Sequence, residues 1–140
     1  MRFNLEIVSP EKLTFSDAVD VVTVPTYEGE ISILANHTPL VSIIQPGELR
    51  IKKGAEITYL AISGGFIQVT GHRVIILADA VERAEEIDLE RAEKARERAQ
   101  QMLEEKRHDQ ISRLDVGTMA ALERALTRIK VARRRTTRGT

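Results

Sequence analysis

The sequence predicts an α+β protein in which an N-terminal antiparallel β-sandwich is followed by a C-terminal antiparallel two-helix hairpin. Two observations predict it. Apolar and polar residues alternate through residues 1–78, and near residue 87 the apolar spacing changes to three and four. Charge changes there too: residues 1–86 contain 7 Lys or Arg and 12 Asp or Glu, whereas residues 87–140 contain 14 and 9. We therefore expect two domains with different partners, residues 1–84 and residues 85–140.

The first domain is expected to contain about eight to ten short strands. Phe3, Leu5 and Ile7 alternate with polar residues, and similar apolar series recur as far as Leu77. Turn residues separate the series, among them Gly64-Gly65, which we interpret as a hairpin turn. The alternation changes phase between Val19–Val21 and Val22–Val24, which indicates a bulge or a strand buried on both faces. No helical pattern interrupts the strands, so βαβ units are not expected.

The second domain is expected to be two helices that begin at acidic caps. Asp88 is predicted to cap a first helix from about Leu89 to Lys106, with Ile87 packing back onto Ala92, and Asp115 to cap a second helix. The predicted apolar stripes are Leu89, Ala92, Ala95, Ala99, Met102 and Leu103 on the first helix and Met119, Leu122, Ala125, Leu126, Ile129 and Ala132 on the second. At about 25 cal/mol per Å2 of apolar surface, alanine-rich stripes bury little. We therefore expect a hairpin that can open.

Composition excludes several functional classes. The chain has no Cys, so it has neither a disulfide framework nor a thiolate site. His37, His72 and His108 lack the spacing of metal ligands, and we expect no metal. No G-x-x-x-x-G-K-[ST] loop is present, so we expect no nucleotide hydrolysis and no catalytic residue. The N-terminus lacks the apolar stretch of a signal peptide, and no apolar run approaches the roughly 20 residues of a membrane span. Any membrane contact is therefore expected to go through another protein.

Five sequence blocks resemble, in order and spacing, those of the epsilon subunits of bacterial F-type ATP synthases. They are Gly29-Glu30-Ile31, His37-Thr38-Pro39-Leu40, residues 45–51, Ser63-Gly64-Gly65-Phe66 and Ala78-Asp79-Ala80-Val81-Glu82. The resemblance extends from Phe3 to about Arg133. It implies a non-catalytic central-stalk subunit that couples proton-driven rotation to ATP synthesis. It also implies a peripheral location on the cytoplasmic face of the bacterial cell membrane.

The same resemblance implies partners. The sandwich would bind the gamma subunit and rest on the ring of c subunits, with Glu30 and His37 in contact loops at residues 28–30, 36–38 and 44–47. The hairpin would permit hydrolysis when folded and inhibit it when extended along gamma. In the extended state, basic residues of the second helix would meet acidic residues of the catalytic beta and alpha subunits. For that contact we name Arg133, Arg134 and Arg135.

One further segment resembles a nucleotide-binding motif. Residues 87–92 match the I-D-x-x-R-A sequence of those epsilon subunits that bind ATP. The resemblance implies that the ATP-binding residues are Glu82, Ile87, Asp88, Arg91, Ala92, Arg98, Arg124 and Arg128. Helical spacing places Arg91 with Arg98 on one face, and Arg124 with Arg128 on another, and guanidinium groups bind triphosphates well. We expect ATP to be a regulatory ligand that favours the folded hairpin, and no catalytic cofactor.

Simpler interpretations stay open at this point. Asp88 is a sufficient helix cap by itself, and Arg91 and Arg98 fit a solvated face paired with neighbouring glutamates. The arginine run from residue 133 to 140 fits a solvated tail. Two other functions would use the same residues: a free-standing ATP sensor, and a basic-helix nucleic-acid binder whose affinity falls steeply with salt. Both leave the sandwich blocks unexplained, so we expect the rotor subunit and no nucleic-acid partner.

Overall fold

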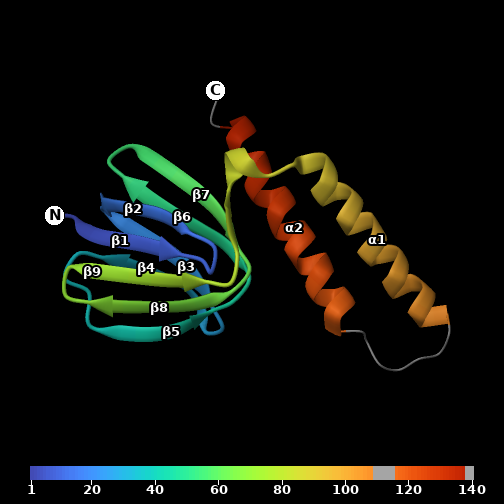
Figure 1. Ribbon diagram of the computed structural model, residues 1–140, viewed down its shortest axis with the longest axis horizontal. Helices are drawn as coiled ribbons and strands as arrows, with labels where there is room; N and C mark the ends of the chain where they lie inside the picture. The colour runs from blue at the N-terminus through green and yellow to red at the C-terminus, as the bar shows by residue number, and fades with distance from the viewer. Residues whose placement is uncertain (109–115, 138–140) are drawn as a thin grey trace. The chain divides into compact units, whose positions relative to one another are not determined.

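The computed structural model describes residues 1–108 and 116–137, and the chain divides into two compact units, residues 1–83 and 84–140 (Figure 1). The first unit contains ten strands and the second a short 3-10 helix and two α-helices, which confirms the predicted α+β fold. The strands are β1 (Phe3–Val8), β2 (Leu13–Val19), β3 (Val21–Thr26), β4 (Gly29–Leu34), β5 (Leu40–Ile44), β6 (Gly47–Lys53), β7 (Glu56–Ile62), β8 (Gly65–Thr70), β9 (Arg73–Ala78) and β10 (Val81–Arg83). The helices are η1 (Ala84–Glu86), α1 (Leu89–His108) and α2 (Val116–Thr137).

The strands form one sheet that folds over a single core. Their order is β10-β7-β6-β3-β5-β8-β9-β1-β2, with β4 paired to β3 outside this path. All pairs are antiparallel except β1 with β9, which run parallel. Phe3, Leu5 and Ile7 lie in the core, as the alternation predicts. The core also contains Val19, Val22, Val24, Ile33, Ile44, Leu49, Ile51, Leu60, Ile62, Ile67, Val69, Val74, Ile76 and Ala78.

The change of phase near residue 20 has two causes. A strand boundary lies at Asp20, between β2 and β3, rather than a bulge within one strand. After this boundary Val22, Thr23 and Val24 are all buried, so β3 is covered on both faces. The expectation of a doubly buried strand is therefore confirmed. The alternative expectation of a bulge is wrong, because one strand ends here and another begins.

Gly64 and Gly65 do not form a hairpin turn, so that prediction is wrong. The strand before them, β7, pairs with β6 and β10, whereas β8 after them pairs with β5 and β9. The two glycines carry the chain between strands that are not neighbours. Both have positive φ, 118° at Gly64 and 149° at Gly65, which side-chain-bearing residues rarely adopt.

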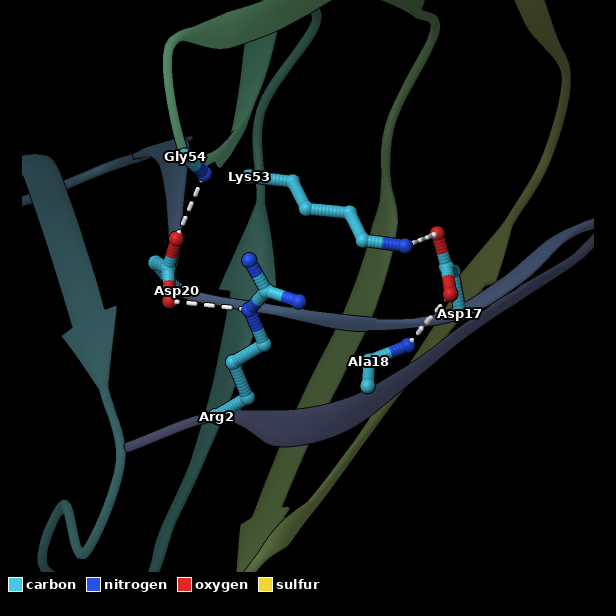
Figure 2. Close-up of polar contacts among 6 residues, drawn as sticks. All are labelled: Arg2, Asp17, Ala18, Asp20, Lys53 and Gly54. Carbon is cyan, nitrogen blue, oxygen red and sulfur yellow. Dashed lines mark hydrogen bonds and ion pairs between the residues drawn. The ribbon is translucent and has the colours of Figure 1, made fainter.

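Two aspartates, one in β2 and one just after it, join this part of the chain to the end of β6 and the β6–β7 turn (Figure 2). Asp17 accepts a hydrogen bond from Lys53 Nζ at 2.7 Å. Asp20 accepts from the Gly54 backbone N–H at 2.6 Å and from Arg2 Nε at 3.3 Å. The hydrogen bond from Lys53 is the main cause that lowers the pKa of Asp17, and the one from Gly54 is the main cause that lowers the pKa of Asp20.

These lowered pKa values predict a loss of stability in acid. A carboxyl whose pKa is lower in the folded state stabilises the fold above its unfolded pKa, about 3.9 for Asp, and this contribution disappears as pH falls through the folded pKa. We expect the urea midpoint of the wild type to drop below pH ~4, and to drop less steeply in Asp17→Asn/Asp20→Asn. Asp79→Asn, at the exposed β9–β10 turn, is the control. Parallel pH profiles for the wild type and the double variant would contradict the assignment.

The helical unit begins at the predicted cap. The Asp88 carboxylate accepts the Arg91 backbone N–H at 3.1 Å, and the Asp88 carbonyl accepts the Ala92 N–H at 3.0 Å. Helix α1 starts at Leu89, as predicted, and ends at His108 rather than near Lys106. The predicted cap of the second helix, Asp115, lies outside the described residues.

The seam between the two helices is narrower than the sequence predicts. Its buried residues are mostly small: Ala92 and Ala99 on α1, and Thr118, Ala125, Ile129 and Ala132 on α2. Met102, Met119 and Leu126 were predicted on the stripes but are 47%, 46% and 45% exposed. Small residues let helices approach closely, so longer side chains at the flanks extend past the neighbouring helix. The seam therefore buries even less apolar area than expected.

Candidate functional site

The sandwich carries an exposed row of apolar side chains across three adjacent strands. Ile43 on β5, Phe66 on β8 and Leu77 on β9 are 54%, 53% and 53% exposed. Ile43 pairs with Phe66 and Phe66 pairs with Leu77, so the three side chains lie side by side on one face. Val41, two residues before Ile43 on the same face, is 72% exposed. We call Val41, Ile43, Phe66 and Leu77 the apolar row. Contiguous exposed apolar residues are typical of protein interfaces.

The apolar row is not among the features predicted from the sequence, although the sequence contains a signal for it. Three members of the row adjoin a buried isoleucine, so one side chain of each pair faces the core and the other faces outward. The pairs are Ile43–Ile44, Phe66–Ile67 and Ile76–Leu77. Doubled apolar residues in a short strand therefore mark a sheet that is apolar on both faces.

The structure brings together two of the three predicted contact loops. The turns at residues 28–30 and 44–47 are neighbours, because the Gln45 N–H donates to the Pro25 carbonyl at 3.0 Å. Residues 36–38, with His37, follow the opposite end of β4. Glu30 is held by Arg50 Nη2 at 2.5 Å, and Arg50 Nη1 lies 3.4 Å from the buried Glu48. Glu30 and His37 therefore lie at opposite ends of β4.

Arg91 and Arg98 line a common hollow on the helical unit. Its volume is about 310 Å3, and its other lining residues are Lys94, Glu97 and Gln101. Arg98 also lines a second hollow of about 400 Å3 in the seam. The other residues of that hollow are Ala95, Ala99, Met102, Gly117, Thr118 and Ala121. Arg98 thus connects the surface that carries Arg91 with the start of α2.

Arg124 and Arg128 line neither of these hollows. They lie, however, on the face of α2 that also carries Gly117 and Ala121, which line the second hollow. Gly117, Ala121, Arg124 and Arg128 follow one another at steps of three and four residues, so they share a face. The helices run antiparallel, since Glu93 pairs with Arg133 while Ala99 and Met102 share a hollow with Gly117. Moving seven residues back along α1, from Arg98 to Arg91, therefore corresponds to moving seven forward along α2, from Ala121 to Arg128. The four arginines follow one flank of the seam.

The remaining predicted ATP-binding residues have structural roles in the fold. Ile87 and Ala92 are 1% and 0% exposed, so neither residue presents surface to a ligand in this structure. Asp88 caps α1, as described above. Glu82 lies on β10 in the sandwich unit.

The predicted partner-contact arginines lie at the end of α2. Arg133 Nη2 is 3.4 Å from Glu93 Oε1, with the two side chains 61% and 39% exposed. Arg134 is half-buried, and the side chain of Arg135 lies outside the described residues. Within residues 1–108 and 116–137, no three or more His, Cys, Asp or Glu side chains gather as metal ligands would. In the same part of the chain, no helix is apolar and long enough to cross a membrane.

Both units match models of one protein family. Residues 2–84 match the β-sandwich domain of the ATP synthase delta/epsilon chain, and residues 85–133 match its long α-helix domain. An ATP synthase epsilon chain of Dehalococcoides mccartyi is 46% identical over 134 residues, 96% of this chain and 94% of the relative. One of Desulforamulus reducens is 44% identical, over 91% of this chain and 95% of the relative.

A solved structure shows the same fold at a lower sequence identity. The matching chain belongs to the Euglena gracilis mitochondrial ATP synthase assembly of OSCP, F1 and c-ring. It is 27% identical with a TM-score of 0.74, and the match covers 96% of this chain and 81% of that one.

The fold and these matches define a class, the non-catalytic subunits of rotary ATP synthases. More particularly, the chain belongs to the ATP synthase delta/epsilon chain family, and its bacterial relatives are epsilon chains.

Proposed function

We propose that this chain is a central-stalk subunit that couples proton-driven rotation to ATP synthesis and inhibits ATP hydrolysis through its helices. Bound ATP favours the folded, non-inhibitory hairpin. The subunit is peripheral to the cytoplasmic face of the bacterial cell membrane and reaches it only through the complex. The observation that carries the proposal is the apolar row on a sandwich whose bacterial relatives are epsilon chains.

The apolar row is the docking surface for the gamma subunit. Its three central side chains are uncharged, lie on rigid paired strands and need no rearrangement to meet a partner. Each stays about half exposed in the free chain, so docking removes further apolar area from water at about 25 cal/mol per Å2. The c-ring contact is assigned to Glu30 and its turn, which Arg50 orders.

The arginine flank of the seam supports regulation by ATP. Arg91 and Arg98 on α1 and Arg124 and Arg128 on α2 supply guanidinium groups from both helices. A triphosphate between them forms charge-assisted hydrogen bonds to both helices and holds them together. The ligand stabilises the folded hairpin by about 2.7 kcal/mol at a concentration 100 times its Kd. That is large for a seam of alanines, so ATP can set the balance between folded and extended states.

Opening the hairpin also makes basic side chains of α2 available for inhibition. The Glu93–Arg133 ion pair links the two helices and is lost when they separate. Because both side chains are substantially exposed, the pair contributes only about 0–1 kcal/mol. Arg133, with Arg134 and Arg135, then becomes available to carboxylates of the catalytic beta and alpha subunits. Loss of this ion pair therefore adds little to the energy needed to open the hairpin.

Isothermal titration of the full chain with ATP and ADP tests the nucleotide site. We expect saturable ATP binding, weaker ADP binding, and at least about tenfold weaker ATP binding in Arg91→Ala and Arg124→Ala, since a charge-assisted bond contributes about 1.5–3 kcal/mol. Lys12→Ala is the control for the loss of one cation, because Lys12 is an exposed residue of the sandwich unit, and it should leave ATP binding intact. Failure of the wild type to bind millimolar ATP would reduce the motif to a capped helix.

A further inference from the structure

The helical unit has a second cationic hollow that shares no residue with those of Arg91 and Arg98. Its volume is about 480 Å3. The floor is formed by Leu126 and Ile129, and the cations around it are Arg96 from α1 with Lys130, Arg133 and Arg134 from α2. Among the residues that the structure describes, no carboxylate lines it. Arg96 is five residues from Arg91, about 140° around a helix of 3.6 residues per turn, so the hollow lies on the opposite flank of the seam.

The position of this charge follows from the antiparallel register. Glu93 and Arg133 pair across the seam at 3.4 Å. Three residues further along α1 is Arg96, and three residues back along α2 is Lys130. In the helical turn next to the Glu93–Arg133 ion pair, Arg96 on α1 therefore lies opposite Lys130 on α2. Neither Arg96 nor Lys130 makes a hydrogen bond or ion pair with another described residue.

Two features distinguish this hollow from a solvated charged face. Arg96 Nε is buried and lacks a hydrogen-bond partner among the described residues. Such a donor is costly unless something anchors the guanidinium group. The apolar floor of Leu126 and Ile129 also displaces water from one side of the charges, which strengthens their attraction for an anion. A compact anion with several oxygens satisfies donors of both helices at once.

We propose that this hollow binds a multiply charged phosphate anion of the pyrophosphate type, bridging Arg96 on α1 to Lys130 and Arg133 on α2. The source is either free pyrophosphate or the phosphate tail of a nucleotide. Binding relieves repulsion between like charges on the two helices, so it favours the folded hairpin independently of the flank that carries Arg91 and Arg98.

Equilibrium binding of radiolabelled inorganic pyrophosphate to the full chain, without added metal, tests the site. We expect saturable binding that is at least tenfold weaker in Arg96→Gln and in Lys130→Gln. Both variants change partly or fully exposed side chains, and circular dichroism checks that their helix content is kept. Lys12→Gln, which removes one positive charge at an exposed position of the sandwich unit, is the control and should bind pyrophosphate as the wild type does. Competition by ATP would identify a nucleotide tail as a source, whereas competition by pyrophosphate alone would identify the free anion.

Two results would overturn the proposal. One is the absence of saturable pyrophosphate binding by the wild type. The other is a loss of binding in Arg98→Gln with none in Arg96→Gln, which would place the anion on the opposite flank. Because the ATP site is tested through Arg91 and Arg124, and this hollow through Arg96 and Lys130, failure of one site is distinguishable from failure of the other.

Discussion

Gly65→Ala is expected to be strongly destabilising to the sandwich. A Cβ at Gly65 would lie 2.0 Å from the Leu77 carbonyl oxygen and 2.9 Å from Ala78 Cα. Both are backbone atoms of β9, so no side chain can rotate away and the strand itself must move. The φ of 149° adds strain for any residue with a side chain. We expect a loss of about 3 kcal/mol or more, measured by urea unfolding, from a total of about 5–15 kcal/mol.

Gly71→Ala separates the close approach from the backbone strain. Gly71, in the β8–β9 turn, also has positive φ, 55°, but a Cβ there would meet nothing within 4 Å. The loss of stability in Gly71→Ala should come only from the left-handed backbone conformation, about 1–2 kcal/mol. Equal losses in the two variants would show that the contact with β9 is not the reason for glycine at position 65.

Phe66→Glu is expected to weaken docking to the gamma subunit about 30-fold or more while leaving the sandwich folded. Phe66 is the centre of the apolar row, paired with Ile43 on one side and Leu77 on the other. A carboxylate there would be desolvated at the middle of the interface. Substitutions at such central positions cost about 2 kcal/mol or more, roughly a 30-fold loss of affinity. Titration of purified gamma subunit with wild-type and variant chains measures it.

Thr70→Glu is the matched control for added charge. Thr70 is on the same strand and the same outward face as Phe66, but it pairs with Arg73 at the far end. We expect it to bind gamma within about threefold of the wild type, as rim substitutions do. Undiminished binding by Phe66→Glu, or an equal loss in both variants, would remove the apolar row as the docking surface.

Sequence patterns predicted the parts of the fold that depend on local chemistry. Alternation identified the sandwich because the inward face of most strands enters one core. Asp88 was found because an N-cap depends only on its own turn, and the structure shows its bond to the Arg91 N–H. The expected partners came from the resemblance of five sequence blocks to a known family, because no local pattern identifies a partner.

The parts that failed depend on contacts between distant segments. Gly64-Gly65 has the composition of a hairpin turn, and only the pairing of β8 with β9 shows why glycine is required there. Met102, Met119 and Leu126 satisfy the helical period, but the separation of the two helices is set by the small residues between them. The apolar row was hidden because its residues are the outward members of doubled apolar pairs. Arg96 and Lys130 face each other only through the antiparallel register.

A covalent link across the hairpin tests its role as a brake. The chain has no Cys, so Glu93→Cys/Arg133→Cys provides its only two thiols, at positions already joined by side chains. A bismaleimide can connect them in the isolated chain before it is added to the catalytic complex. Glu93→Cys/Glu97→Cys, linked within α1, is the control, because it leaves the two helices free to separate.

ATP hydrolysis by the reconstituted complex is then the deciding measurement. Our account predicts that the chain cross-linked between helices binds the complex but does not inhibit hydrolysis, while the same variant without the linker, and the control linked within α1, both inhibit it. Equal inhibition by the chain locked across the hairpin would contradict a brake that works by extending its helices.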